Sequence, residues 1–173
     1  MRWWLVGSYI RRNRVTDQTL TREEVIQRNL EAVEAHFHNE TPETIQQAIA
    51  LYTDDIYWEG PSRGLVFDNA GDALAGYHDI FKSLVIHKHT HLRRFATEEF
   101  VFDDCIYEAT YVEDHMANFP FPAGTKVSMR LAHVFEMRDG KIAKEIAYEI
   151  IREAGGPTDN DNIPAGSEVT VFE

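Results

Sequence analysis

Apolar residues in the first half of the chain recur at the three- and four-residue spacing of an amphipathic helix. The first stripe follows TREE at Thr21–Glu24, a capping box with a hydroxyl at the N-cap and a carboxylate three residues later. Two more stripes follow TPET and DNAGD, so the pattern predicts three helices. The stripes are Ile26, Leu30, Val33 and Phe37; Ile45, Ala48, Ile49 and Tyr52; and Leu74, Tyr77, Phe81 and Leu84.

After the third stripe the apolar period changes from 3.6 to 2, which indicates strands. A shorter strand, DDIYWEGP, stands between the second and third helices, and EVTVFE near the C-terminus can add an edge strand. Tight turns are predicted at Asp103–Asp104 and Arg138–Gly140. The four long strands are predicted at 86–102, 105–115, 125–137 and 141–151.

Three helices followed by an antiparallel sheet predict an α+β domain with helices on one face of a long, curved sheet. Pockets tend to form in the concave space between two such layers. We divide the 173 residues into an arm at 1–20, one domain at 21–153 and a peripheral tail at 154–173. The apolar run Trp3–Gly7 is too short for a membrane span, and an arm or extended reading frame is favoured over a transit peptide.

Charge and composition narrow the partners and the chemistry. Lys and Arg number 17 and Asp and Glu 29, and the net charge of −12 repels nucleic acid phosphates and anionic lipids. We therefore expect no nucleic acid and no membrane partner. Cys105 is the single cysteine, which fits a reducing, cytoplasmic location, and its strand position favours a small buried hydrophobe. Phosphate-binding glycine loops, redox motifs and nucleophile elbows are absent from the sequence, so we expect an enzyme without a cofactor.

The order ALYTDDIYWEGP, a helix, and two hairpins ending in VFEMRDGKI resembles the SnoaL-like polyketide cyclases of the nuclear transport factor 2-like superfamily. The resemblance covers about Thr21 to Glu153, and LYTDDIYWE and FEMRDGKI are its most specific parts. It implies a cone, in which a curved antiparallel sheet wraps around the N-terminal helices. This fold hosts isomerases, cyclases, dehydratases, epoxide hydrolases and proteins without catalysis, so it selects no reaction.

The catalytic sets of three kinds of relative are only partly matched. The corresponding positions are Asn29, Gly60 and His133 for the steroid delta-isomerases, Glu145 and Ala147 for the limonene-epoxide hydrolases, and Ala32 and His87 for the scytalone dehydratases. No set is intact, so none of these activities transfers directly.

His133 is the one titratable residue in the alternating stripe Met129, Leu131, His133, Phe135 and Met137. The resemblance implies that this stripe faces the interior of the cone. Burial lowers the pKa of a histidine and a nearby carboxylate raises it, so His133 with a glutamate is a candidate acid/base unit. The alternative is a core histidine bonded to a backbone carbonyl or a tyrosine hydroxyl.

Glu145, on the neighbouring strand, is the glutamate that would pair with His133. In a regular two-residue hairpin, Ile146 lies beside His133, and Glu145 points to the opposite face. The two residues share a face only if a bulge or a longer turn intervenes, as the family precedent suggests. Otherwise Glu145 and Glu149 form a solvated face, paired with Arg130.

The strand before Pro61 offers a second acid at the pocket. Alternation places Tyr57 and Glu59 on one face and Trp58 and Gly60 on the other. We slightly favour the orientation that turns Tyr57 and Glu59 inward, which gives the pocket a hydroxyl and a carboxylate. In the other orientation Trp58 forms a flat wall.

The remaining histidines are weaker candidates for a functional site. His87, His89 and His91 alternate as metal ligands can, but the sequence offers no obvious fourth ligand, so we predict no metal. HFH at 36–38 closes the first helix, where histidine suits the helix dipole.

Two functions of different class follow from this pattern. The first is a cofactor-independent acid/base enzyme, an isomerase, cyclase or dehydratase, that acts on a mostly apolar molecule with a carbonyl or hydroxyl group. Its catalytic residues would be His133, Glu145, Glu59 and Tyr57, and its pocket wall would include Trp58, His87, Phe81, Met129, Leu131 and Ala147. The second is a non-catalytic ligand-binding or dimerisation module. Long, half-exposed strands also predict a homodimer through the outer sheet face.

Overall fold

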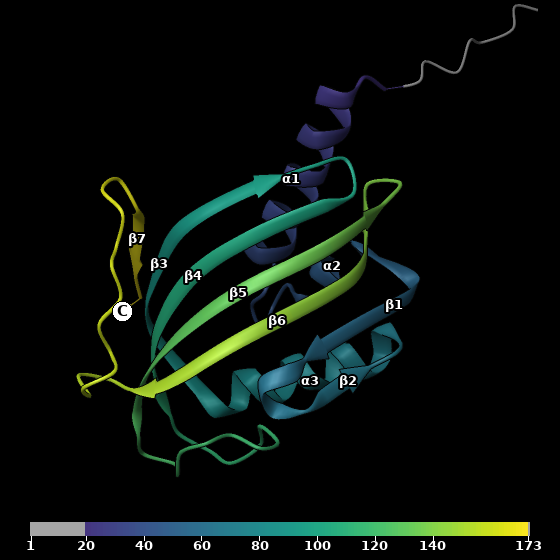
Figure 1. The fold of residues 1–173 in the computed structure, drawn as a ribbon. Coiled ribbons are helices and arrows are strands. Elements are labelled where there is room, and N and C mark those ends of the chain that lie inside the picture. The colour runs from purple at the N-terminus through teal and green to yellow at the C-terminus, as the bar shows by residue number, and fades with distance from the viewer. Residues whose placement is uncertain (1–19, 173) are drawn as a thin grey trace, which may run out of the picture.

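The computed structural model describes residues 20–172, so most of the predicted arm at 1–20 lies outside the described residues. Three α-helices precede or interrupt the early strands, and four long strands follow them (Figure 1). The elements are α1 (Arg22–His38), α2 (Ile45–Ile49), β1 (Tyr52–Gly60), the 3-10 turn η1 (Pro61–Arg63), β2 (Leu65–Phe67), α3 (Ala70–Ser83), β3 (Leu84–Ala96), β4 (Phe100–Tyr111), β5 (Lys126–Arg138), β6 (Lys141–Glu153) and β7 (Glu168–Val171).

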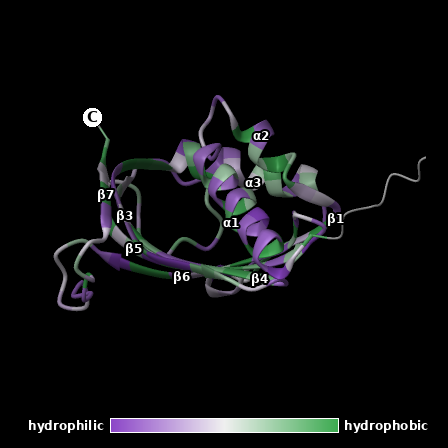
Figure 2. Cartoon of the chain, turned by 90° about the horizontal axis from the view of Figure 1, so that it is seen from above, coloured by the Kyte–Doolittle hydropathy of each residue, from purple (hydrophilic) through white to green (hydrophobic). Residues whose placement is uncertain are grey.

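The described strands form one open sheet of seven strands in the order β2-β1-β6-β5-β4-β3-β7. All pairs are antiparallel except β1 with β6, which is parallel, so the sheet is mixed. All three helices lie over one face of the curved sheet (Figure 2). The predicted α+β cone is confirmed, and the parallel β1–β6 pair is its one departure from an antiparallel sheet.

Helix α1 begins at the predicted capping box. The Thr21 hydroxyl accepts from the Glu24 amide at 3.3 Å, and the Thr21 amide donates to the Glu24 carboxylate at 2.7 Å. The face that is fully buried is Asn29, Ala32, Val33 and His36, one position away from most of the predicted stripe. Leu30 and Phe37 border this face and pack against the core. A polar residue therefore stands at each end of the buried face.

The turn between β3 and β4 lies at residues 97–99, so the predicted turn at Asp103–Asp104 is wrong. Both aspartates stand in the middle of β4 and are buried. Arginines compensate their charges on the two faces of the sheet: Arg94 bonds Asp103 at 2.8 Å, and Arg130 bonds Asp104 at 2.8 Å. A sequence pair that is typical of a turn is here held in a strand by partners on the two neighbouring strands, β3 and β5.

Two other local predictions are confirmed. The β5–β6 turn places Asp139 at φ 53° and Gly140 at φ 77°, the left-handed conformation that an Asp-Gly pair tolerates. The EVTVFE segment supplies β7, an edge strand antiparallel to β3. Among the described residues, no helix is long and apolar enough to cross a membrane.

Candidate functional site

A cavity of about 600 Å³ opens between the helices and the inner face of the sheet. Trp58, Phe81, Met129, Leu131 and Ala147, all predicted as pocket wall, lie in its lining. Ile80, Leu84, Ile86, Met116 and Ile151 extend the apolar wall. The cavity lies where the curved sheet predicts it, and most of its surface is apolar carbon.

Glu145 faces this cavity because the β5–β6 pairing is irregular. The register shifts between Glu136 and Met137, which places Phe135 opposite Glu145 and His133 opposite Ala147. Glu145 therefore shares the inner face with His133, as expected only if a bulge or longer turn intervened. The side chain is buried, and the solvated alternative for Glu145 is wrong.

The partner of Glu145 is His36 rather than His133. His36 Nε2 lies 3.4 Å from Glu145 Oε2 and 2.9 Å from Glu40 Oε1. Tyr52 donates its hydroxyl to Glu145 at 2.6 Å, and the Tyr77 hydroxyl donates to Glu40 at 3.0 Å. The five side chains form one hydrogen-bonded network, which we call the His36 network. Glu40 and Tyr77 carry it to the cavity wall.

The charged groups of the His36 network shift one another's pKa values. Burial alone would lower the pKa of His36, but hydrogen bonds and charge from Glu145 and Glu40 outweigh burial and raise that pKa to about 10. Burial would raise the pKa of Glu145, but the charge of His36 outweighs it and lowers that pKa. Burial and the charge of Glu145 raise the pKa of both Tyr52 and Tyr77, so both remain protonated donors at neutral pH.

His133 lies on the cavity wall without the predicted glutamate partner. Its ring packs against Phe37, with ring centroids 5.2 Å apart, and stacks on Phe135 at 5.8 Å. The side chain is 6% exposed, and its Nδ1 has no hydrogen-bond partner among the described residues. In the described part of the chain, Nδ1 of His133 therefore bonds neither a backbone carbonyl nor a tyrosine hydroxyl, whereas the alternative of a core histidine requires one of them.

A second polar group adjoins His133 on the sheet. Asp103 on β4, which faces His133 across the ladder, accepts from Arg94 at 2.8 Å and bonds His91 Nε2 at 3.1 Å. His89, His91 and Arg94 line the cavity. His89 stacks on Tyr107 with ring centroids 4.5 Å apart, and burial lowers its pKa. Cys105 is fully buried, as predicted, and burial raises the pKa of its thiol.

Tyr57 and Glu59 point away from the cavity, so their predicted orientation is wrong. Glu59 pairs with Lys144 at 3.2 Å, and the same lysine lies over the ring of Tyr57, 5.0 Å from its centroid. Trp58 is the inward residue instead, on the same face as the fully buried Ile56. Because Ile56 and Trp58 are both large and apolar, the face of β1 that carries them is the buried one.

His87 also lies outside the cavity, against expectation. The pairing of β3 with β4 shifts between Ile86 and Lys88, so His87 occupies a bulge, is exposed and bonds the Thr110 hydroxyl at 2.8 Å. The bulge brings Ile86 and His89 to the inner face instead. His87 therefore takes no part in the pocket wall.

Glu149 forms a buried ion pair that the sequence did not indicate. Arg63 Nε donates to Glu149 Oε2 at 2.7 Å, and Arg63 Nη2 donates to Oε1 at 2.9 Å. The expected partner, Arg130, binds Asp104 and Asp161 instead. Glu149 reaches the cavity from β6, and Arg63 reaches a second, smaller cavity of about 320 Å³ beside it.

His36, Glu40 and Asp103 are the site residues that sequence reasoning missed. For His36 a signal was present, because it lies four residues after Ala32 and three after Val33, on the face that helical spacing buries. Glu40 follows His36 by four residues, which is the spacing of one helical turn. For Asp103 the sequence carried the opposite signal, that of a turn.

Three comparisons place the chain among known proteins. The family model for the SnoaL-like domain matches residues 30–145. A comparison with curated proteins finds no match. Among solved structures, the chain resembles a proposed polyketide cyclase from Xanthomonas campestris pv. campestris, with TM-score 0.59 and 15% identity over 72% of this chain and 91% of that chain. It also resembles an LEH-like epoxide hydrolase from M. tuberculosis, with TM-score 0.56 and 16% identity over 72% of this chain and 84% of that chain.

An NTF2-like protein from Burkholderia xenovorans LB400 is similar as well, with TM-score 0.60 and 13% identity over 72% of this chain and 91% of that chain. Identities this low show a common fold and no common reaction. The family model is more specific, because it covers more than half of the sequence. The chain therefore belongs to the SnoaL-like domain family.

Proposed function

We propose that this protein is an acid/base enzyme that moves a proton on a mostly apolar small molecule with a carbonyl or hydroxyl group. The reaction would be an isomerisation, a cyclisation or an elimination of water. The observation that carries the proposal is the His36 network, a buried set of charged and phenolic groups that opens into an apolar cavity through Glu40 and Tyr77. Buried charges are costly, and they cluster where chemistry needs them.

The cavity supports a substrate of modest size and low polarity. Its volume of about 600 Å³ is within the range of small-molecule sites. Met129, Leu131 and Ile151 on the sheet and Phe81 on α3 all line it, so most contacts would be apolar. Polar groups on the wall, among them Glu40, Tyr77 and His133, would fix the orientation of an oxygen-bearing molecule.

Glu40 is the residue that would accept the proton. Its side chain is 20% exposed, whereas that of Glu145 is 2% exposed. The His36 imidazolium bonds Glu40 and orients it, and Glu145 supplies the buried counter-charge. Tyr77, held protonated, would turn its one O–H from Glu40 to a developing oxyanion once Glu40 has taken the proton. These roles replace those predicted for Glu59 and Tyr57, which face away.

His133 would act as a second proton-transfer group, next to the same Phe37 and Phe135 rings that His36 contacts. Its unpartnered Nδ1 is able to take or give a proton once a substrate oxygen reaches it. Phe37 and Phe135 fix the plane of the ring, so the reacting nitrogen has a defined direction. The predicted role of His133 thus continues as a proposal without Glu145 as its partner.

A ligand-binding module without catalysis is the second candidate. It is favoured by one observation: the two inward glutamates of β6 are each tied in a buried ion pair, Glu145 with His36 and Glu149 with Arg63. Such pairs leave both carboxylates without a free role in proton transfer. Glu40 then decides between the two functions, because its side chain is the most exposed of the three carboxylates, at 20% against 2% for Glu145 and 8% for Glu149.

The deciding experiment measures solvent proton exchange. Apolar ketones and hydroxyketones that raise the melting temperature of the protein are incubated with it in D₂O, and deuterium incorporation beside the carbonyl is followed by NMR. The enzyme should speed exchange, and Glu40→Gln should lower the rate by about 10²–10⁴-fold while binding persists. Glu43→Gln, an exposed neighbour on the same segment, is the matched control. Binding with no exchange in any ligand would refute the enzyme and favour the binding module.

A further inference from the structure

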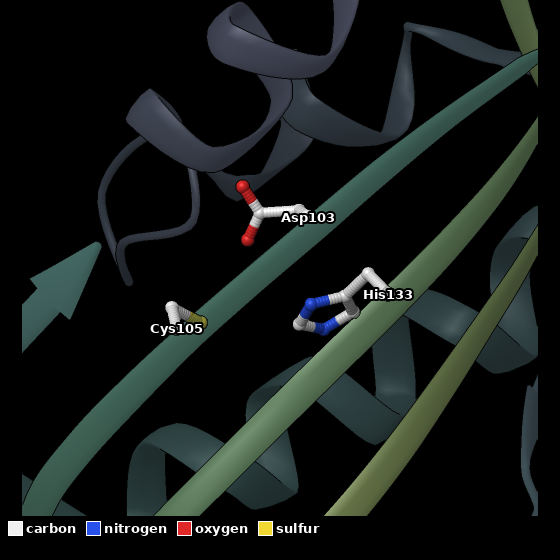
Figure 3. Close-up of side chains that lie close together, drawn as sticks. All are labelled: Asp103, Cys105 and His133. Atoms are coloured by element: carbon white, nitrogen blue, oxygen red, sulfur yellow. The ribbon is translucent and has the colours of Figure 1, made fainter. Parts of the chain in front are cut away.

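Three metal-ligating side chains converge on the inner face of the sheet beside the cavity. Asp103 and Cys105 come from β4 and His133 comes from β5 (Figure 3). One donor atom from each residue lies within 4.8 Å of the other two. The convergence follows from the sheet itself, because Asp103 and Cys105 alternate onto one face and His133 stands opposite Asp103.

The orientation of His133 is an independent pointer to a ligand. The side chain is more than nine-tenths buried, and its Nδ1 has no hydrogen-bond partner among residues 20–172. Native proteins rarely leave a buried nitrogen unpaired. His133 presents its ring toward Asp103 and Cys105 in Figure 3, so a cation between them would satisfy it.

The donor set identifies the class of ion. A thiolate, an imidazole and a carboxylate together suit Zn²⁺ and related borderline divalent ions better than Mg²⁺ or Ca²⁺, which prefer oxygen ligands. His91 lies opposite Cys105, and its Nε2 is 3.1 Å from Asp103 Oδ1, so it contacts one ligand without belonging to the convergent set. We propose that Asp103, Cys105 and His133 form a binding site for a divalent transition metal of the zinc class, with His91 holding Asp103 in place.

Neighbouring residues are compatible with such an ion. Arg94 and His91 both bond Oδ1 of Asp103, which leaves Oδ2 for the metal. Hydrogen bonds to a ligating carboxylate commonly orient it. His91 and His133 line the cavity, so the ion would be reached from that side. A second group of potential metal ligands consists of His36, Glu40 and Glu145. It is less suited to a metal ion, because its two carboxylates keep the imidazole protonated.

This site goes beyond the proposed function and does not rest on it. The proposed base, Glu40, belongs to the His36 network, and its exchange assay reports proton transfer rather than metal binding. A bound ion would occupy the nitrogen that His133 otherwise offers to a substrate. Metal-free and metal-loaded protein would therefore differ in the availability of His133.

Cobalt titration of the tag-free, reduced and metal-free full chain tests the site. Cys105 is the one cysteine in the sequence, so any thiolate-to-cobalt charge-transfer band must arise from it. We expect one Co²⁺ per chain, a near-ultraviolet charge-transfer band, visible bands of a tetrahedral ion, and displacement by Zn²⁺. Cys105→Ser should abolish the charge-transfer band, and His133→Asn and Asp103→Asn should each weaken binding by about 10-fold or more.

His87→Ala is the matched control, because His87 lies on the same sheet, is exposed and points outside the cavity. It should bind Co²⁺ as the wild type does. Circular dichroism of each variant establishes folding, and His133→Asn carries the test if Cys105→Ser does not fold. A folded wild-type chain that shows no charge-transfer band at saturating Co²⁺, or a His133→Asn variant that binds as tightly as wild type, would overturn the site. Loss of exchange activity in Glu40→Gln would still stand on its own.

Discussion

His36 on α1 and Glu145 on β6 lie 3.4 Å apart, Nε2 to Oε2, and both side chains are almost fully excluded from solvent. The pair joins the helix layer to the sheet across the deepest part of the domain. Burying two charges is costly, and their mutual attraction offsets this cost only while both are present. The stability of the domain should therefore depend on both members of the pair.

The effects of replacing His36 and Glu145 on stability should not be additive. We expect His36→Gln to lower the free energy of unfolding by about 3–5 kcal/mol, because it leaves the buried Glu145 without a cation, and Glu145→Gln to cost less, because Glu40 still pairs with His36. The double variant should lose less than the sum of the two. Urea unfolding of the four proteins measures this cycle. Glu98→Gln, which removes the exposed pair with Arg22, should cost at most about 1 kcal/mol. Strictly additive losses at 36 and 145 would contradict the coupling.

Stability should fall as the solution becomes alkaline. The pKa of His36 is about 10 in the folded chain and near its ordinary value of 6.5 when unfolded. The stabilisation from its proton is therefore complete below about pH 6.5 and is lost as pH rises toward 10. Within this window the free energy of unfolding should drop by at most about 1.4 kcal/mol per pH unit. Unfolding of wild type and His36→Gln from pH 6 to 10 should give curves that converge, and parallel curves would count against the raised pKa.

His133→Ala separates a catalytic from a structural histidine. If His133 transfers protons, the variant should lower the exchange rate by about 10²–10⁴-fold and change the melting temperature modestly. A structural role would reverse the order, with a loss of about 1–3 kcal/mol and unchanged activity per folded molecule. Both quantities are measured on the same preparation, with His87→Ala as the exposed control.

The outer face of the sheet should join two copies of the chain. Tyr148 and Ile150 on β6 are exposed there, and Tyr57 on β1 is exposed as well, beside Lys144 of β6. We expect a homodimer by light scattering at micromolar concentration, and Ile150→Glu should shift it toward the monomer. Ile163→Glu, at an exposed apolar position in the tail, should leave the dimer intact. A monomeric wild type would refute this assembly.

The sequence predicts elements better than it predicts which residues face the cavity. Helices and long strands follow from a period that many residues share, so a single misfit does not change them. A face depends on each local register, and bulges at His87 and between Glu136 and Met137 reverse it without a sequence mark. Glu145 was therefore ambiguous and His87 was misplaced.

Buried polar residues were the other source of error. Asp103 carries the composition of a turn, and only the contacts with Arg94 and His91 on the neighbouring strand explain its place inside β4. His36 could have been found, because helical spacing puts it beside Val33. The orientation of Trp58 was also readable, since Ile56 shares its face. What could not be read is the pairing of His36 with Glu145, which depends on the complete fold.

The parallel pairing of β1 with β6 should determine which strand is added last during folding. Strands β3 to β6 are neighbours in sequence and close as successive hairpins, whereas Tyr52 meets Ile142 only after the intervening chain is organised. Contacts between distant segments form slowly because loop closure costs entropy. We therefore expect the meander to gain amide protection first and β1 to dock last. Pulse-labelled hydrogen exchange during refolding measures this sequence, and early protection of β1 would exclude it. Docking of β1 brings Tyr52 to Glu145, so the cavity would acquire its polar network in the final step of folding.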